Sequence, residues 1–300
     1  MYKGIFFAFL TAVISGVSIY YSKISVAKID PLILAATRNS FVGIGFIILF
    51  LLTKNTKQLF KLSKKEWVLL LGIGLIGGSI PFYLFFTGVK LIGAQGANVI
   101  HKSLFIWVAL LSAILLKEKI NKSYVVAGVL VFIGTYFFTP FKLFFGKGEQ
   151  FILLATLLWS VENILAKKVL SRTSSELVGL FRMVIGGCVL LLITTISGKG
   201  KLLIGLNPTQ WQVIAVGGSI LFFYVFTWYK ALKFAPASLT TLILTFSLVI
   251  GNVLSGALIR VPLLKNDWYS MIYISSAMCT LIFLMPLVKK TRKLFARSHE

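Results

Sequence analysis

Two side chains of opposite charge, Lys102 and Glu162, lie inside long apolar stretches of the sequence. If these stretches cross a lipid bilayer, a charge near its centre costs at least about 2.5–3.5 kcal/mol, so each should face protein or water and have a partner. One interpretation is that both line a cavity, where Lys102 attracts an anionic group and Glu162 attracts an amine or a proton. The alternative is a buried ion pair that only fixes how two helices pack.

Other polar and aromatic side chains near this pair could contact the same solute. They are His101, Asn163, Trp159, Tyr83, Tyr224 and Asn252. A histidine titrates near physiological pH and could relay a proton, and an aromatic ring could stack on an organic solute. Each type also has a structural explanation, because a neutral histidine or an asparagine can join two helices and a ring can fill the core.

Two arginines, Arg38 and Arg182, occupy equivalent places near the start of two other apolar stretches. In a functional interpretation they belong to alternating gates or attract an anionic substrate. In a structural interpretation they extend to the nearer membrane interface or cap carbonyl groups of a neighbouring helix. The sequence leaves both interpretations open.

The chain that carries these residues is strongly apolar. Of its 300 residues, 58% are hydrophobic and 13% are charged, and the mean hydropathy is +0.93. Soluble domains carry about 25% charged residues, so the composition predicts an integral membrane protein, and its long apolar runs predict an all-α one. The chain has only two cysteines, Cys188 and Cys279, and two histidines, His101 and His299. These are too few for a disulfide framework or a zinc site, so neither a metal nor another cofactor is expected.

A helix needs about 20 mostly apolar residues to cross about 30 Å of hydrocarbon. Ten segments qualify, and their connections are too short to hold a soluble domain. The predicted spans are 3–22, 31–53, 67–89, 94–116, 123–140, 149–170, 175–197, 211–232, 236–258 and 268–288. Pro81 lies inside the third span and predicts a kink there, because proline removes a backbone hydrogen bond.

Basic residues are distributed unevenly between the two sets of connections. With the N-terminus inside, 19 of the 28 Lys and Arg residues that flank the spans fall on the inner side. The positive-inside rule then predicts a multi-pass protein of the cytoplasmic cell membrane with both termini in the cytoplasm. Orientation in the membrane thus explains the net charge of +23, and no nucleic-acid partner is expected.

The sequence also resembles itself at an offset of 143 to 145 residues. The matches include Trp67 with Trp211 and the two intramembrane arginines with each other. They divide the chain into two halves, 1–145 and 146–300, of which the second ends in a short basic tail. Because five spans is an odd number, the second half enters the membrane upside down. The prediction is therefore ten transmembrane helices arranged as two inverted five-helix repeats.

Several short motifs follow one another along nearly the whole chain. They are Arg38, Leu116-Lys117-Glu118-Lys119, Leu158-Trp159-Ser160, Lys168 and Arg182. In this order they resemble motifs of the drug/metabolite transporter superfamily, in particular its EamA-like ten-span branch. The resemblance implies ten helices around a central cavity and the export or exchange of small organic solutes. The sequence departs from that pattern at His101-Lys102-Ser103, where the family is ordinarily apolar.

These observations predict a secondary transporter that exports or exchanges amino-acid-like metabolites or drugs by alternating access. The chain has no G-x-x-x-x-G-K-[ST] loop that would couple transport directly to ATP. The expected partners are a small organic solute and the lipid bilayer, with coupling to protons left open. The alternatives are a passive channel and an intramembrane enzyme, although His101 has no second histidine or aspartate in any span to work with.

Overall fold

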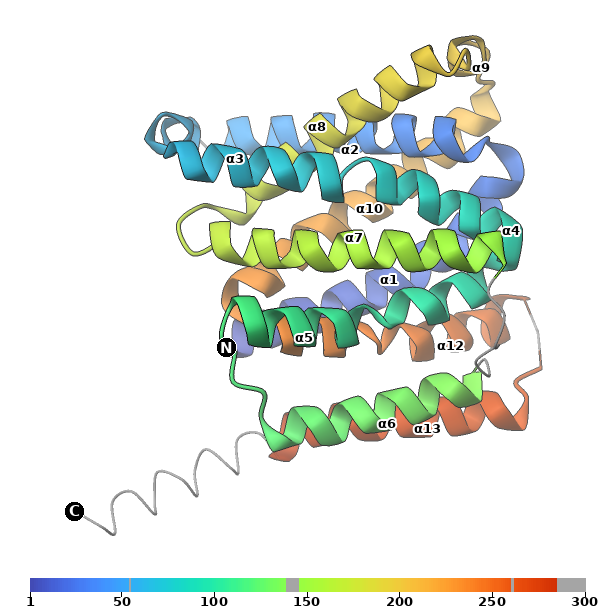
Figure 1. The fold of residues 1–300 in the computed structure, drawn as a ribbon. Coiled ribbons are helices and arrows are strands. Elements are labelled where there is room, and N and C mark those ends of the chain that lie inside the picture. The colour runs from blue at the N-terminus through green and yellow to red at the C-terminus, as the bar shows by residue number, and fades with distance from the viewer. Residues whose placement is uncertain (54, 139–145, 260–261, 285–300) are drawn as a thin grey trace.

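The computed structural model describes residues 1–53, 55–138, 146–259 and 262–284, and all regular structure in these ranges is helical (Figure 1). In chain order the elements are α1 (Tyr2–Lys28), α2 (Pro31–Leu52), η1 (Asn55–Lys61), α3 (Lys64–Gly72), η2 (Ile73–Gly77), α4 (Ile80–Lys102), α5 (Leu104–Leu115), α6 (Lys122–Phe138), α7 (Lys147–Val169), α8 (Ser175–Ile196), α9 (Gly200–Ile204), α10 (Pro208–Phe234), α11 (Ala237–Leu244), α12 (Ser247–Ile259), α13 (Lys265–Cys279) and η3 (Thr280–Leu284). The basic C-terminal tail and the last residues of the predicted spans 123–140 and 268–288 lie outside the described residues.

Six stretches of the described helices are long and apolar enough to cross a membrane. They are Tyr2–Lys28, Pro31–Leu52, Lys64–Leu115, Ser175–Ile196, Pro208–Phe234 and Ala237–Leu254. Large apolar side chains such as Phe6, Ile48 and Leu192 are exposed on their outer faces. Such a surface suits lipid, and each helix satisfies its own backbone hydrogen bonds, as a bilayer requires. The prediction of an all-helical, multi-pass membrane protein is therefore confirmed.

Local signals in the sequence set where several helices begin. Asp30 precedes α2 and accepts hydrogen bonds from the backbone N–H groups of Leu32 and Ile33 at 3.0 and 3.4 Å. Asn207 forms a capping box with Gln210 at the start of α10, which satisfies two of the backbone groups that a helix leaves unpaired at its end. Both helices also carry proline in the first turn, where a missing N–H costs little.

The predicted third span is broken rather than continuous. α3 passes into the π-helical turn η2, and Ser79 then has non-helical backbone angles (φ −120°, ψ −98°) before α4 begins. Pro81 lies in the first turn of α4. The predicted kink is confirmed, but it lies just ahead of the proline, because proline is compatible with the first turn of a helix and not with the turn that would precede it.

Three further interruptions shape the bundle. Within α4 two helices meet at Gly93, whose positive φ of 79° is a conformation that favours glycine. α4 and α5 are separated at Ser103, and α11 and α12 are separated at Thr245 and Phe246. At both of the later breaks the last turn closes with a tighter backbone hydrogen bond, from Ser103 N–H to the Ile100 carbonyl and from Thr245 N–H to the Leu242 carbonyl.

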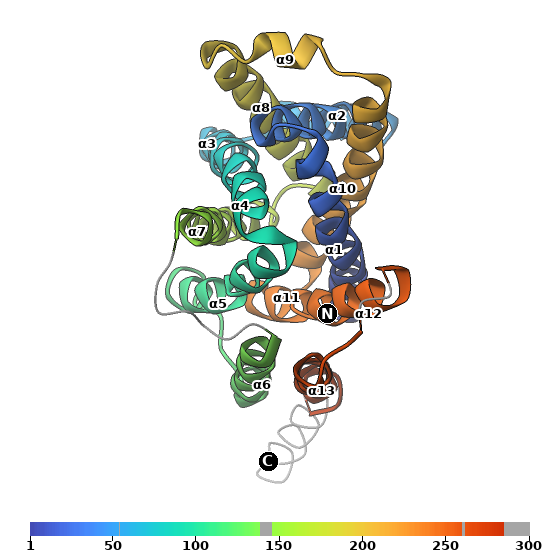
Figure 2. The same ribbon diagram turned by 90° about the vertical axis from the view of Figure 1, so that its right-hand side faces the viewer.

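The helices pack in pairs that join distant parts of the chain. α2 lies along α8, α4 along α7, α1 along α10, and α6 along α13. Viewed along the bundle, α1, α2 and α10 face α4, α7 and α8, while α6 and α13 form a layer at one edge (Figure 2). The largest core cluster lies mainly among α1, α2, α4, α7, α8 and α10. The buried polar residues described below are therefore held by packing from both halves of the sequence.

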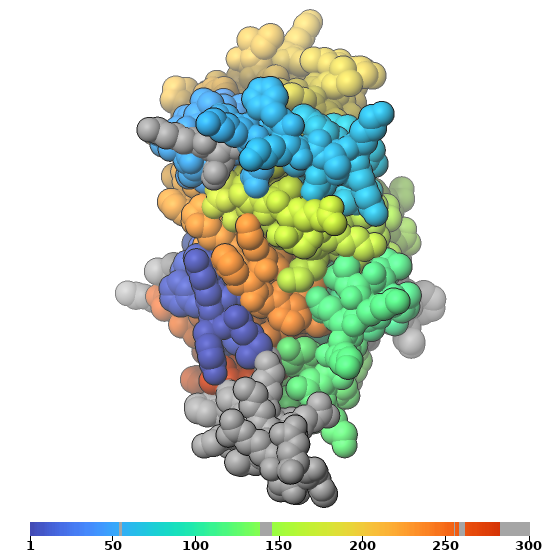
Figure 3. Space-filling view, turned by 90° about the vertical axis from the view of Figure 1, so that its left-hand side faces the viewer, coloured from blue at the N-terminus to red at the C-terminus, as the bar shows by residue number. Residues whose placement is uncertain are grey.

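Polar contacts tie together the connections at each end of the bundle. At one end Lys167 donates hydrogen bonds to the carbonyl groups of Leu232 and Ala235 at 2.6 and 2.7 Å, and Lys233 donates to the Thr173 carbonyl at 3.0 Å. Figure 3 looks onto this end, where the N-terminal residues in dark blue lie beside α10 and α11 in orange. The α1–α2 connection and α9 lie at the opposite end (Figure 1).

Glu118 adds a further tie at the first of these ends. Its carboxylate accepts hydrogen bonds from the backbone N–H groups of Ala237 and Ser238 at 2.8 and 3.2 Å and from the Ser238 hydroxyl at 2.8 Å. α11 has no cap from its own sequence, so this carboxylate from the α5–α6 connection caps it instead. Glu118 therefore fixes the start of α11 against the end of α5.

Candidate functional site

A cavity lies at the centre of the bundle, between helices of both sequence halves. It holds about 640 Å³ of space not filled by atoms, including its opening. Its lining residues come from α1, α2, α4, α5, α7, α8 and α10. They are Ser15, Ser18, Ile19, Ser22, Arg38, Phe82, Phe85, Phe86, His101, Leu104, Trp159, Asn163, Arg182, Leu221, Tyr224 and Trp228. The lining thus combines serine hydroxyls, two arginines and a large aromatic surface.

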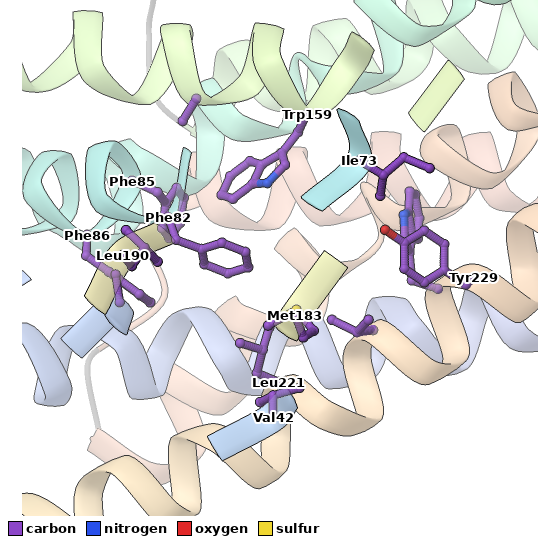
Figure 4. Close-up of a cluster of buried hydrophobic side chains, with 14 of the residues drawn as sticks. Val42, Ile73, Phe82, Phe85, Phe86, Trp159, Met183, Leu190, Leu221 and Tyr229 are labelled. Atoms are coloured by element: carbon purple, nitrogen blue, oxygen red, sulfur yellow. The ribbon is translucent and has the colours of Figure 1, made fainter. Parts of the chain in front are cut away.

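Aromatic side chains of α4 and α7 form one wall of the cavity. Figure 4 shows Phe82, Phe85 and Phe86 gathered near Trp159. The ring centroids of Phe82 and Phe85 lie 5.3 and 5.6 Å from that of Trp159, and His101 lies 5.0 Å from the same ring. Edge-to-face and tilted ring contacts of this kind restrict the orientation of each ring, so the wall is a preformed apolar surface.

The broken third span supplies backbone carbonyl groups to the site. Trp159 Nε1 donates to the Gly77 carbonyl at 2.9 Å, and Arg182 Nε donates to the same oxygen at 3.3 Å. Asn39 Nδ2 donates to the Gly78 carbonyl at 2.7 Å. A break in a helix frees carbonyl oxygens that a continuous helix would use, and these must be satisfied inside a membrane. The interruption therefore positions both a tryptophan and an arginine of the cavity.

Arg38 and Arg182 are both buried, with 1% and 4% of their surface exposed, so they do not extend to the membrane interface. Arg38 Nη2 donates to the Ser18 hydroxyl at 3.2 Å. Its Nε and Nη1 atoms, together with Nη1 of Arg182, are buried with no hydrogen-bond partner within the described protein. Each guanidinium instead lies over a phenylalanine ring, Arg38 over Phe86 at 5.4 Å and Arg182 over Phe82 at 5.6 Å.

Glu162 is fully buried behind this lining. The Tyr229 hydroxyl donates a hydrogen bond of 2.5 Å to its Oε1 atom, while Oε2 has no hydrogen-bond partner among the described residues. The Tyr229 ring also lies under the Arg182 guanidinium, 5.7 Å from its central carbon. Tyr229 therefore stands between a buried carboxylate and a buried guanidinium, contacting both.

Asn163, the next residue along α7, bridges two helices. Its Nδ2 atom donates to the Trp159 carbonyl at 2.8 Å, and its Oδ1 atom accepts a hydrogen bond from Trp228 Nε1 at 2.9 Å. Trp228 in turn stacks on Tyr224, with centroids 6.2 Å apart and an angle of 8° between the planes. Asn163 thus orients a second aromatic pair that lines the cavity.

Lys102 and Glu162 do not form an ion pair with each other, so the interpretation of the two as a buried ion pair is wrong, and neither is among the residues that line the central cavity. Both side chains are buried, and no ion pair joins them among the described residues. Lys102 Nζ donates to the Ser15 hydroxyl of α1 at 3.1 Å, whereas Glu162 meets Tyr229 of α10. The position of a residue along a span gives its depth in the bilayer but not the direction of its side chain around the helix, so the sequence left this choice of partner open.

The remaining predicted residues divide between three places. His101, Trp159, Asn163 and Tyr224 line the central cavity. Asn252 lines a second cavity, of about 890 Å³ including its opening, which lies between α1, the Gly93 region of α4, and α12. Tyr83 is half-buried and lines neither of these two cavities. Ile19 lines both, so the two cavities adjoin along α1.

Several lining residues were not anticipated from the sequence. Ser15, Ser18 and Ser22 follow the three- and four-residue spacing of one helical face, as do Phe82, Phe85 and Phe86. The serine spacing was a signal that could have been used, because a polar stripe on an otherwise apolar span faces protein or water. Nothing local distinguishes Trp228 or Tyr229 from other aromatic residues of α10.

Comparison with known proteins agrees with this architecture. An uncharacterized transporter of Archaeoglobus fulgidus is 26% identical over 251 residues, which cover 82% of this chain and 87% of the relative. YyaM, an uncharacterized transporter of Bacillus subtilis, is 23% identical over 262 residues, covering 82% and 83%. A solved crystal structure shares the fold with a TM-score of 0.73 at 18% identity, covering 94% of this chain and 97% of that one.

The family model of the EamA-like transporter family matches the chain over two segments, residues 2–139 and 146–288. These segments include all the residues of the central cavity. They also include the motifs around Trp159, Arg38 and Arg182 that first suggested this assignment. The chain therefore belongs to the EamA-like transporter family.

Proposed function

We propose that this protein is a secondary transporter that exports or exchanges small organic solutes across the cytoplasmic membrane, with the central cavity as its solute site. The observation that carries the proposal is that buried charged and aromatic side chains from both halves of the chain converge on one cavity. A buried charge is costly in a membrane and marks a functional site by default. The naming of the similar proteins as transporters supports the same conclusion.

The proposed architecture is ten transmembrane spans in two inverted five-helix repeats, residues 1–145 and 146–300. The two separate segments matched by the family model support this division. The packing also supports it, because helices in equivalent positions make equivalent contacts. α1 packs on α10 and α12, and α7, its counterpart in the second half, packs on α4 and α5, which are the counterparts of those two helices.

The breaks between α4 and α5 and between α11 and α12 offer further support for the repeat. Ser103 interrupts the proposed fourth span and Thr245 interrupts the proposed ninth, at an offset of 142 residues that is close to the offset of the sequence repeat. In inverted-repeat transporters, interrupted helices at corresponding positions of the two halves mark the region that binds solute. His101 and Lys102 lie immediately before the first break and are polar residues within this mostly apolar span.

Alternating access requires that the cavity open at one end of the bundle while the other end is closed. The contacts made by Lys167, Lys233 and Glu118 tie α7, α10 and α11 together at one end. We assign this end to the cytoplasm, because the connections that meet there carry most of the flanking basic residues. Both termini then lie in the cytoplasm, and these contacts must break when the cavity opens inward.

Glu162 is the group on which we expect a coupled proton to act. It is fully buried, it has one free oxygen, and its other oxygen meets a tyrosine hydroxyl rather than a cation. A buried carboxylate without an ion-pair partner is stabilised when it is protonated. Uptake or loss of one proton at Glu162 would thus change the contact that joins α7 to α10.

The rival functions make different demands on the structure. A passive channel needs a continuous path, whereas one end of this bundle is tied by hydrogen bonds between helices. An intramembrane enzyme needs a catalytic group beside a base or a metal, and the described residues hold no group of three or more His, Cys, Asp and Glu side chains placed to bind a metal ion. The ring of His101 packs against Phe85 and Trp159 rather than against a nucleophile.

Purified protein in proteoliposomes tests the proposal directly. Vesicles preloaded with a panel of unlabelled amino acids, carboxylates or cationic drugs are diluted, and entry of the labelled solute is followed. A secondary transporter should show entry stimulated by the same solute inside. Trp159→Ala should abolish the stimulation, while Trp268→Ala, a change at an exposed position of α13, should not. Entry that is equally fast with and without internal solute would indicate a channel and contradict the proposal.

A further inference from the structure

The charges buried around the central cavity are not balanced. Among the described residues the buried basic side chains are Arg38, Lys102 and Arg182, and the one buried carboxylate is that of Glu162. Glu162 does not line the cavity, whereas both arginines do. The lining therefore presents cationic groups and no anionic group to a solute.

The two arginines keep free hydrogen-bond donors at this lining. Arg38 has two buried nitrogen atoms without a partner and Arg182 has one, and His101 Nδ1 is also buried and unpartnered. A buried donor costs free energy unless it is paired, and a buried cation costs more unless an anion offsets it. Among the described residues neither arginine forms an ion pair with a carboxylate, and the one nearby carboxylate, Glu162, lies behind the lining and faces Arg182 across Tyr229. A guanidinium binds carboxylate or phosphate oxygens with two parallel hydrogen bonds, so an anion from outside fits these donors.

The surface next to the arginines suits an apolar body. Phe82 and Phe86 lie under the two guanidinium groups, and their own rings are 6.2 Å apart. An arginine, two phenylalanines and a second arginine thus follow one another along the cavity wall. Trp159 and the stacked pair of Tyr224 and Trp228 provide further ring surface. A solute with an anionic group at one end and an apolar or aromatic body can contact both kinds of surface at once.

We propose that the cavity binds organic anions, in which one carboxylate or phosphate group sits on an apolar, preferably aromatic body, and that the guanidinium group of Arg38 or that of Arg182 binds the anionic group. This inference rests on the proposed function, because it takes the cavity to be the solute site. It narrows the solute class, since a free amine would meet two buried cations and no carboxylate at the lining. Organic cations are therefore excluded, and zwitterionic amino acids bind more weakly than the matching acids.

Binding to purified wild-type protein in detergent tests the charge preference without requiring transport. The probes share a phenylethyl body and differ in the head group: 3-phenylpropionate, 2-phenylethyl phosphate, 3-phenylpropanamide, 2-phenylethylamine and L-phenylalanine, which is 3-phenylpropionate with an added amine. Quenching of tryptophan fluorescence reports occupancy, because Trp159 and Trp228 line the cavity. We expect the carboxylate or the phosphate to bind at least tenfold more tightly than the amide and the amine. The stronger of the two anions identifies the head group, and equal or tighter binding of the amine would overturn the proposal.

Variants then locate the anionic group. Arg38→Gln and Arg182→Gln keep hydrogen-bonding capacity but remove the charge, and Arg172→Gln removes an exposed arginine as a matched control. At least one of the two cavity variants should weaken binding of the preferred anion by tenfold or more, with little change for the neutral amide, while Arg172→Gln should have no effect. Unchanged anion binding in both cavity variants would contradict the assignment. If a variant does not fold, the head-group preference of the wild-type protein still decides the question.

Failure of this inference can be told apart from failure of the transporter proposal. Stimulated exchange of an amine or a neutral solute in proteoliposomes, without binding of any anionic probe, would uphold transport and refute the anion site. Anion binding that depends on Arg38 or Arg182, without any stimulated exchange, would uphold the anion site and refute transport.

Discussion

The α-carbon of Gly78 lies directly against the backbone carbonyl of Arg182, so that a side chain at residue 78 would overlap this oxygen. The next turn of α8 is equally close, since a side chain at Gly186 would overlap the backbone of Gly78. The Gly78 carbonyl also accepts the hydrogen bond from Asn39. Three helices, α2, the broken third span and α8, therefore meet at one glycine beside the cavity.

Gly78→Ala should destabilise the protein by about 1–3 kcal/mol, because an inserted methyl group must push backbone apart rather than displace a flexible side chain. Gly72→Ala is the matched control, since its added methyl would meet only Leu165 at 3.7 Å, an ordinary contact. The melting temperature of each purified variant measures the difference. Equal melting temperatures for the two variants would contradict the close contact between Gly78 and the backbone of α8.

Lys102→Met and Glu162→Gln should have independent effects. The two residues have different partners, Ser15 and Tyr229, and share none. Effects of substitutions that share no partner usually add to within about 0.5 kcal/mol. The double variant should therefore lose as much stability as the two single variants together. A double variant that is more stable than either single variant would indicate that Lys102 and Glu162 pair with each other, which would contradict the structure.

Glu162→Gln should separate exchange from accumulation. The amide keeps the hydrogen bond with Tyr229 but cannot gain or lose a proton, so solute exchange should continue while accumulation driven by a proton gradient should fall to background. Proteoliposomes with and without an imposed pH gradient measure both activities. Tyr229→Phe serves as the companion variant, because it removes the hydrogen bond and leaves the carboxylate able to titrate. Accumulation at the wild-type level in Glu162→Gln would exclude Glu162 as the proton site.

The ion pair between Lys199 and Asp30, 2.8 Å apart, should give a small pH-dependent stabilisation. Burial raises the pKa of Asp30, but the hydrogen bond from Lys199 and those from the N–H groups of Leu32 and Ile33 outweigh burial, so the pKa lies below its usual value. A lowered pKa in the folded state stabilises the protein above the unfolded pKa of about 3.9, and this contribution is lost as the pH falls through the folded pKa.

Lys199→Met should therefore lower stability at pH 7 by about 1 kcal/mol or less, since both side chains are partly exposed to solvent. The difference from wild type should shrink as the pH approaches 3. Lys201→Met is the control, because Lys201 is an exposed lysine two residues further on, in the short helix α9 that Lys199 precedes. Thermal unfolding of the three proteins from pH 7 to pH 3 measures the effect, and a difference that grew in acid would show that the sign is wrong.

The two ends of the bundle should face opposite sides of the membrane. With Cys188 and Cys279 replaced by serine, single cysteines at Phe60 and Ile204 offer equivalent targets. These residues are 91% and 88% exposed, and they lie in the α2–α3 and α8–α10 connections, which the proposed topology puts on opposite sides of the membrane. A membrane-impermeant maleimide added to intact cells should label residue 204 and not residue 60, and both after the cells are opened. The reverse pattern would invert the proposed orientation.

The sequence by itself determined that the chain is a helical membrane protein of this family. Apolar runs of about 20 residues are a local property, and proline, aspartate and asparagine mark helix starts through contacts that span three residues or fewer, as at Asp30 and Asn207. The kink in the third span followed from Pro81 for the same reason. Each of these features depends on neighbours in the chain, so the sequence contains all that is needed to predict them.

Only the tertiary structure decided which polar groups meet. The partner of Lys102 is 87 residues away and that of Glu162 is 67 residues away, and each choice depends on how helices turn about their axes when they pack. The position along a span fixes the depth of a side chain and leaves its direction around the helix free, so the sequence could not exclude an ion pair between Lys102 and Glu162. The burial of Arg38 and Arg182 has the same origin, because a long side chain can reach either the interface or the protein interior, and packing between α2 and α8 selects the interior.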